Sequence, residues 1–198
     1  MSNTKHVYIL KRRRKGKTDY RKRKNILMSR SVFVTPRISD KNVSVQFSKP
    51  TQEGDQVVAS ANSQELYKIG WKGSGKSIPG AYLTGLIAGL KAVKAGVNEA
   101  VLYAGLRRFA SGSRLSAVLK GIIDAGVNVP AEEDVLPADE RLRGEHIAEY
   151  AKSLSEQDKE AYAKRFSRMM KMGLKPEEYP DHFEETKKKI QKTYGVTE

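Results

Sequence analysis

The 198-residue chain contains no cysteine, so it can form neither a disulfide framework nor a thiolate metal site. Its three histidines, His6, His146 and His182, stand far apart without the spacing of zinc ligands. No apolar run reaches the length that spans a membrane, and Val7 to Leu10 is too short a stretch for a secretory signal. We therefore expect a cytoplasmic protein that uses no metal or other cofactor.

Acidic residues are scarce at the start of the chain. Residues 1–30, which we call the arm, hold twelve Lys and Arg but only one acid, Asp19. The arm has a net charge of +11, whereas residues 31–198 carry only +3 of the total of +14. Such a block repels itself and buries little apolar area, so it should not fold alone. Once its charges are neutralised, we expect a short helix at 18–30, with Ile26, Leu27 and Met28 docking on the domain. Its natural partner is a polyanion, because released counterions then favour binding.

The arm has two possible interpretations. A solvated tail with weak, non-specific affinity is the simpler one. The mixture of residues favours nucleic acid instead. Gly16 lets the backbone approach a phosphate closely, and Tyr20 offers an aromatic plane to an unpaired base. The Arg side chains supply a bidentate fork for phosphate. We therefore predict that the arm binds nucleic acid.

A β-sheet is predicted after the arm. Residues 31–39 are rich in β-branched side chains, but Pro36 removes a ladder donor and indicates an edge strand or a bulge. Turn residues at 40–42 precede the clearest period-2 alternation in the chain, at 43–48. These two strands predict an antiparallel hairpin, with a third strand at 57–61.

Two helices and one further strand are predicted next. An apolar helix spans 79–95, ends at Gly96, and carries a face of small residues that should pack on a sheet. The apolar run at 100–106 predicts a strand covered on both faces. A second helix follows at 114–125. This order predicts an α/β fold, with a mixed sheet (an antiparallel hairpin plus a parallel strand) packed against two helices.

The sequence changes character after Pro130. Residues 131–140 are acidic and contain proline, which is typical of a linker. Three helices are predicted here: one at 141–154, one that follows a capping box of Ser155 and Asp158, and one from about Pro180 onward. We accordingly divide the chain into the basic arm (1–30), an α/β core domain (31–130), and a linker with a helical C-terminal extension (131–198).

The segment Gly70–Ser77 matches the Walker A pattern of P-loop nucleotide-binding proteins. A P-loop needs a buried strand leading directly into it, but a short helical segment at 64–68, capped by Ser63, intervenes. The run at 101–106 also lacks the acid that would hold Mg²⁺. No Ser-His-Asp order or paired-carboxylate site stands out either. The loop is interpreted as offering Trp71, Lys72 and Lys76 to an RNA or protein surface.

The segment Arg12–Arg23 resembles the opening signature of the 5S rRNA-binding L-eighteen family of large-subunit ribosomal proteins, especially its archaeal and eukaryotic branch. Further segments resemble this family, in the family's order: Glu65–Lys72, Ala81–Leu86, Gly112–Arg114, Leu119–Gly121, Gly144–Tyr150 and Asp158–Phe166. The resemblance thus covers nearly the whole chain. Two residues depart from the family's pattern: Pro36 interrupts a strand, and Tyr103 stands where relatives often carry an acid.

The resemblance implies a structural RNA-binding protein and not an enzyme. It also implies an α/β fold, in agreement with the fold derived from the residues. The implied partners are 5S rRNA, 23S rRNA and neighbouring ribosomal proteins of the central protuberance, with no membrane and no small-molecule substrate. A generic basic RNA-binding protein is the alternative. The expected RNA contacts lie in the arm, beside the first turn, in the Gly-rich loop and before the second helix: Lys11, Arg12, Arg13, Arg14, Lys15, Lys17, Thr18, Tyr20, Arg21, Lys22, Arg23, Lys24, Arg37, Lys41, Lys72, Arg107, Arg108, Ser111 and Arg114.

Overall fold

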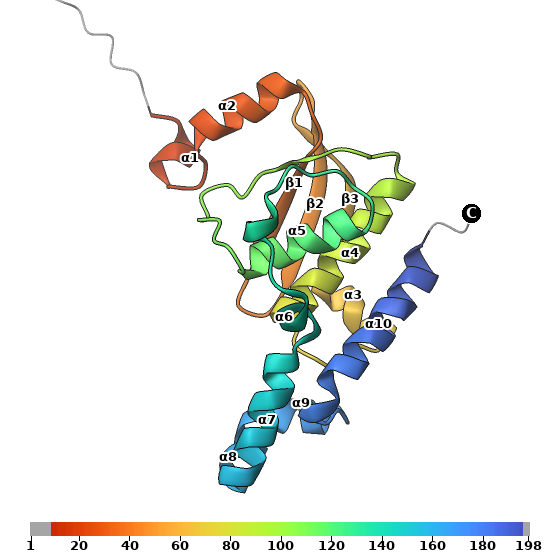
Figure 1. The fold of residues 1–198 in the computed structure, drawn as a ribbon. Helices are drawn as coiled ribbons and strands as arrows, with labels where there is room; N and C mark the ends of the chain where they lie inside the picture. Colours follow the sequence, from red (N-terminus) through yellow and green to blue (C-terminus); the bar gives the residue numbers. More distant parts are fainter. Residues whose placement is uncertain (1–8, 196–198) are drawn as a thin grey trace, which may run out of the picture.

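The structure, a computed structural model, describes residues 9–195, so His6 and Val7 lie outside the described residues. Figure 1 shows two helices, α4 (Ile78–Lys94) and α5 (Arg114–Asp124), lying over a β-sheet, with residues 11–29 of the arm at one end of the sheet and residues 145–171 at the other. The strands stand in the order β3-β2-β1-β4. Their bounds are Phe33–Ile38 (β1), Val43–Pro50 (β2), Asp55–Asn62 (β3) and Val101–Leu102 (β4).

The pairing of these strands confirms the predicted mixed sheet. Strand β2 is antiparallel to both β1 and β3, whereas β4 is parallel to β1. The alternation in β2 has the expected result, because Val43, Val45 and Phe47 are fully buried while Ser44 and Gln46 are half-buried. The buried side chains join the core cluster that α4 and α5 complete.

The last strand is much shorter than the sequence predicts. Strand β4 contains only Val101 and Leu102, and Val101 is 40% exposed. The chain then leaves the sheet, turns at Gly105 with a φ of +63°, and leaves Leu106 55% exposed. The prediction of a strand buried on both faces at 100–106 was therefore wrong. The apolar composition of the segment is typical of a buried strand. In the structure, however, no neighbouring strand or helix covers these side chains on both sides.

The position of Pro36 agrees with the predicted edge. The backbone N–H groups of Val101 and Tyr103 donate to the carbonyl oxygens of Val32 and Val34, so these two residues of the β1 segment face β4. Pro36 lies two residues further along and faces the same side, past the point where the pairing with β4 ends. Its missing N–H is therefore not needed by a neighbouring strand.

Helices α4 (Ile78–Lys94) and α5 (Arg114–Asp124) pack against each other at backbone distance. A Cβ atom on Gly85 would lie 2.3 Å from the carbonyl oxygen of Val118, and one on Gly121 would lie 2.2 Å from that of Tyr82. The small-residue face of α4 therefore packs on α5. The prediction that this face packs on the sheet was wrong. Glycine is required here because any side chain would push the two backbones apart.

Helix α3 (Ser63–Ile69) connects the sheet to the Gly-rich loop. Its N-cap is Asn62, which forms a capping box with Glu65, and not the predicted Ser63. Ser63 is instead buried, where its hydroxyl donates to Asn42 and accepts from the backbone N–H of Val43. The helix ends at Gly70, whose φ of +100° is the left-handed conformation that glycine favours.

The C-terminal extension contains more, shorter helices than predicted. The helix expected at 141–154 is broken at Gly144, which has a φ of +82°. The next helix is capped by Asp158 itself and not by a box beginning at Ser155. The elements after α5 are η1 (Glu133–Val135), α6 (Asp139–Arg143), α7 (Glu145–Gln157), α8 (Lys159–Arg165), α9 (Ser167–Lys171), η2 (Pro176–Glu178) and α10 (Tyr179–Tyr194).

Trp71 joins the C-terminal helix α10 to the core. It is only 1% exposed and packs edge-to-face on Tyr179 and face-to-face on His182, with ring centroids 5.5 and 5.1 Å apart. The expectation that the loop offers Trp71 to a partner surface was therefore wrong. The aromatic side chains supplied by α10 bury it, and that contact spans more than a hundred residues of sequence.

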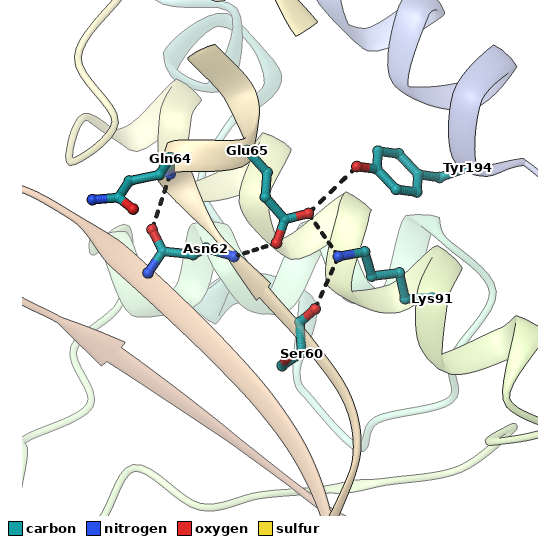
Figure 2. Close-up of polar contacts among 6 residues, drawn as sticks. All are labelled: Ser60, Asn62, Gln64, Glu65, Lys91 and Tyr194. Atoms are coloured by element: carbon teal, nitrogen blue, oxygen red, sulfur yellow. Dashed lines mark hydrogen bonds and ion pairs between the residues drawn. The ribbon is translucent and has the colours of Figure 1, made fainter. Parts of the chain in front are cut away.

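Glu65 fixes the far end of α10, as Figure 2 shows. Its carboxylate accepts from Lys91 Nζ of α4 at 2.6 Å and from the Tyr194 hydroxyl of α10 at 3.4 Å. It also accepts from the Asn62 backbone N–H at 3.1 Å, while Lys91 donates to the Ser60 carbonyl oxygen. One carboxylate thus connects α3, α4 and α10.

The contact between α4 and α5 yields a prediction about stability. We expect Gly85→Ala to lower the free energy of unfolding by about 1–3 kcal/mol, the usual cost of overpacking a well-packed interior. The helix-propensity gain of alanine over glycine, about 1 kcal/mol, opposes this cost but does not cancel it where backbone atoms must move. Urea denaturation measures the change. Enlarging an exposed residue of α8, Ala163→Leu, is the control and should change stability by less than about 0.5 kcal/mol.

A second prediction concerns pH. Partial burial lowers the pKa of His182, and its Nε2 accepts a hydrogen bond from the Lys72 backbone N–H at 3.0 Å. The neutral ring is therefore favoured in the folded state. Since the unfolded chain binds the proton first, stability should fall as the pH drops below about 6.5, the ordinary histidine pKa.

Thermal unfolding between pH 7.5 and 5 tests this prediction. His182→Gln retains an acceptor but does not titrate, so its melting temperature should fall less on acidification than that of the wild type. His146→Gln measures the second histidine contribution separately, because burial lowers the pKa of His146 as well and this variant leaves His182 in place. Equal acid sensitivity of His182→Gln and the wild type would contradict the prediction.

Candidate nucleic-acid interface

The arm contains two helices, α1 (Lys11–Arg14) and α2 (Tyr20–Ser29). The helix predicted over 18–30 is thus confirmed as α2. The single acid of the arm, Asp19, is its N-cap and accepts hydrogen bonds from the backbone N–H groups of Arg21 and Lys22 at 2.9 and 3.3 Å. A carboxylate at this position satisfies free helix donors and complements the helix dipole.

Arg23 attaches the arm to the sheet. Its guanidinium forms an ion pair with Asp55 at the start of β3 and lies 4.9 Å from the centre of the Phe33 ring in β1. Phe33 in turn packs edge-to-face on Tyr103. A predicted phosphate contact therefore also has a structural role. The sequence carries no signal for it, because Asp55 and Phe33 are remote along the chain.

The expected apolar docking of α2 is only partly present. Ile26 is half-buried, but Leu27 and Met28 are 42% and 70% exposed. The prediction that all three side chains dock on the domain was therefore wrong. A single turn of helix cannot direct three consecutive side chains at the same surface, since consecutive residues point about 100° apart.

A cleft of about 730 Å³ lies between the arm and the sheet; we call it the arm cleft. Its walls come from the arm, from β1 and from the loop after β4. Among the described residues that line it, Asp55 alone is acidic, and Asp55 is paired with Arg23. Its cationic lining residues come from all three walls: Arg12, Lys17, Arg23, Arg37 and Arg107. Thr18 lines it too and accepts a hydrogen bond from Arg12 Nε at 2.8 Å.

The electrostatics of the arm cleft suit a polyanion. Five cationic side chains around one hollow focus a positive potential into it, and this raises the local concentration of anions. Four of the five are arginines, which can bind phosphate in a bidentate manner. The cleft exists because β4 is short: the lining residues Thr35, Pro36 and Arg37 belong to the stretch of β1 that β4 leaves unpaired.

A second hollow of about 1100 Å³, which we call the apolar pocket, lies on the other side of the loop after β4. It includes the predicted residues Lys22, Arg107 and Arg108, and it shares Tyr103 and Arg107 with the arm cleft. Tyr103, where the sequence departs from the family's pattern, therefore lines both hollows. Tyr20, the predicted stacking residue, is half-buried and lies outside the described linings of both.

The other predicted residues are dispersed. Lys72 Nζ donates to the Gly173 carbonyl oxygen, and the Ser111 hydroxyl donates to that of Asp134, so both already contact protein. Arg114 lines a separate cleft of about 500 Å³ with Lys76, Arg141 and His146. The remaining side chains are exposed, one in the turn before β2 and the others on the arm: Lys41, Lys11, Arg13, Arg14, Lys15, Arg21 and Lys24.

The Gly-rich loop does not form a phosphate cradle. The helix α3 precedes it where a P-loop has a strand. Within the loop, the Gly75 backbone N–H donates to the Tyr67 hydroxyl at 3.0 Å, and the Ser77 hydroxyl donates to the Ser74 carbonyl oxygen at 2.7 Å. Across residues 9–195, no three His, Cys, Asp or Glu side chains are grouped to hold a metal ion, and none of the helices is long and apolar enough to cross a membrane.

The arm cleft has the charge that suits a polyanion, and comparison with known proteins identifies the family of the chain. A family described as "Ribosomal large subunit proteins 60S L5, and 50S L18" matches residues 5–98. Proteins named "Large ribosomal subunit protein uL18" are similar over nearly the whole chain. That of Aeropyrum pernix is 50% identical over 93% of this chain and 87% of its own length, and that of Thermofilum pendens is 47% identical over 92% and 93%.

The chain therefore belongs to the uL18 family of large ribosomal subunit proteins. The members of this family are ribosomal proteins and not enzymes. The family resemblance read from the sequence is thus confirmed.

The anchoring role of Arg23 can be tested against its neighbour Arg21. Both substitutions, Arg23→Ala and Arg21→Ala, remove one charge from α2, but only Arg23 contacts Asp55 and Phe33. An ion pair and a cation–π contact near the protein surface are each worth up to about 1 kcal/mol. Amide hydrogen exchange in α2 should therefore quicken roughly 5- to 30-fold in Arg23→Ala, the range that about 1–2 kcal/mol implies. Equal acceleration in Arg21→Ala would show that charge alone matters.

Proposed function

We propose that this protein is a structural constituent of the large ribosomal subunit that binds 5S rRNA and helps attach it to 23S rRNA in the central protuberance. Membership of the uL18 family supports the ribosomal role. The observation that carries the RNA-binding part is the arm cleft, where five cations from three separate chain segments surround one hollow. On this proposal the protein acts in the cytoplasm, as part of the ribosome.

The proposed interface extends from the arm cleft over the exposed arm. The arginines of the cleft hold the RNA backbone, while the exposed cations of α1 and α2 contact further phosphates. Phosphate contacts of this kind fix position and register but carry no sequence information. Selectivity for one RNA then depends on its shape, because a folded RNA must present phosphates to the arm and to the cleft at once.

The C-terminal extension has a different role in this proposal. Helix α10 packs on the core through Trp71 and Glu65, whereas α7 and α8 lie at the end of the sheet away from the arm (Figure 1). Tyr150 and Met170 are exposed in this region, at 44% and 39%. We assign the extension to contacts with neighbouring ribosomal proteins and the arm with the core to RNA.

A matched pair of triple variants tests the RNA-binding surface. One variant carries Arg12→Ala, Lys17→Ala and Arg37→Ala in the arm cleft. The control removes the same charge from exposed lysines of α10 with Lys188→Ala, Lys189→Ala and Lys192→Ala. Each lost phosphate contact should flatten the slope of log K against log salt by roughly 0.7–0.9. Binding of 5S rRNA over a salt series should therefore show a slope lower by roughly 2–3 in the cleft variant and an unchanged slope in the control.

Two results would contradict the proposal. Equal slope changes in the two triple variants would mean that total charge, and not the arm cleft, determines binding. Equal affinity of the wild type for 5S rRNA and for an unrelated folded RNA of the same length, at physiological salt, would favour the generic basic RNA-binding protein. Saturable binding of Mg·ATP that Lys76→Ala abolishes would instead revive the P-loop interpretation.

A further inference from the structure

The apolar pocket combines an apolar floor with a cationic rim. Its floor is apolar: Leu119 is buried in the core, and Ile26, Phe109 and Val135 are half-buried around it. Its rim is cationic, with Lys22, Arg107 and Arg108 all exposed. Among the described lining residues, Glu132 alone is acidic.

These two surfaces match the two halves of a nucleotide. The faces of a base are flat and apolar and gain by stacking on aromatic or aliphatic side chains, while its phosphate requires cations. At about 1100 Å³ the pocket exceeds the roughly 300–1,000 Å³ that commonly holds a small ligand, so one nucleotide fits without rearrangement. Two lining residues, Asn25 and Glu132, also carry hydrogen-bonding groups of the kind that can pair with the edge of a base.

The pocket is continuous with the arm cleft. The segment from Tyr103 to Gly105 and the side chain of Arg107 line both, so only this loop separates the two hollows. An RNA strand whose phosphates lie on the cations of the cleft can therefore cross the loop and place the next residue in the pocket. A base that is paired within a duplex could not enter, because its faces are already stacked.

We propose that the apolar pocket binds one unpaired nucleotide of the RNA held by the arm cleft, an inference that rests on the proposed RNA-binding function. The base packs against Phe109 and Ile26, and its phosphate lies on Arg107 and Arg108. The arm cleft supplies affinity that depends on salt, whereas the pocket supplies affinity that depends on an exposed base. The pocket thus gives the protein a means to select an RNA with a bulged or looped-out residue at the correct position.

Phe109→Ala tests the pocket, with Tyr150→Ala in α7 as the matched aromatic control remote from it. Loss of a stacking side chain should weaken 5S rRNA binding about 5- to 150-fold with little change in the salt slope. Ala131→Leu is a second variant: it narrows the pocket from an exposed lining position and leaves the core intact. Ile26→Ala should also weaken binding, whereas Leu27→Ala, its exposed neighbour on α2, should not.

Chemical probing of unpaired bases identifies the nucleotide directly. One base should be protected in the wild-type complex and become reactive with Phe109→Ala or Ala131→Leu, but not with Tyr150→Ala. If the wild type prefers 5S rRNA while all these variants bind it equally and give the same protections, this inference is overturned and the proposed function stands. If the wild type shows no preference for 5S rRNA, the proposed function fails and this inference fails with it. Crosslinking of Phe109 to a ribosomal protein and not to RNA would also overturn it.

Discussion

Repulsion among the cations of the arm is the constraint on which the rest of this structure depends. A net charge of +11 within thirty residues cannot be buried, so the arm must be held beside the domain by few contacts. One carboxylate of the domain, Asp55, meets this need by pairing with Arg23, while Asp19 caps α2 within the arm itself. The remaining cations stay available to solvent and, on our proposal, to RNA.

The domain in turn is shaped to receive the arm. Strand β4 ends after two residues, and the space along β1 that a longer strand would fill becomes the floor of the arm cleft. On the opposite side of the sheet, glycines let α4 and α5 approach closely and form a solid layer. The closely packed helix pair and the arm cleft therefore both lie against β1.

The fold was predictable where a local pattern determines structure. The alternation at 43–48 gave strand β2, and the apolar periodicity between Gly70 and Gly126 gave α4 and α5. Predictions failed where distant residues decide: Trp71 is buried because α10 covers it, and the run at 100–106 leaves the sheet because nothing covers its second face. Likewise, the arm was recognisable from its charge, but the arm cleft and the apolar pocket were not. Their walls come from segments as far apart as Arg12 and Val135.

The unpaired stretch of β1 beside the arm cleft has a consequence for solubility. Exposed strand edges are templates on which other chains can add a strand and begin to aggregate. At this edge Pro36 offers no N–H donor, and the next residue, Arg37, adds an exposed charge. A proline together with a charge is a common protection against edge-to-edge association. Pro36 and Arg37, which line the arm cleft, thus also make this edge a poor template for pairing with another chain.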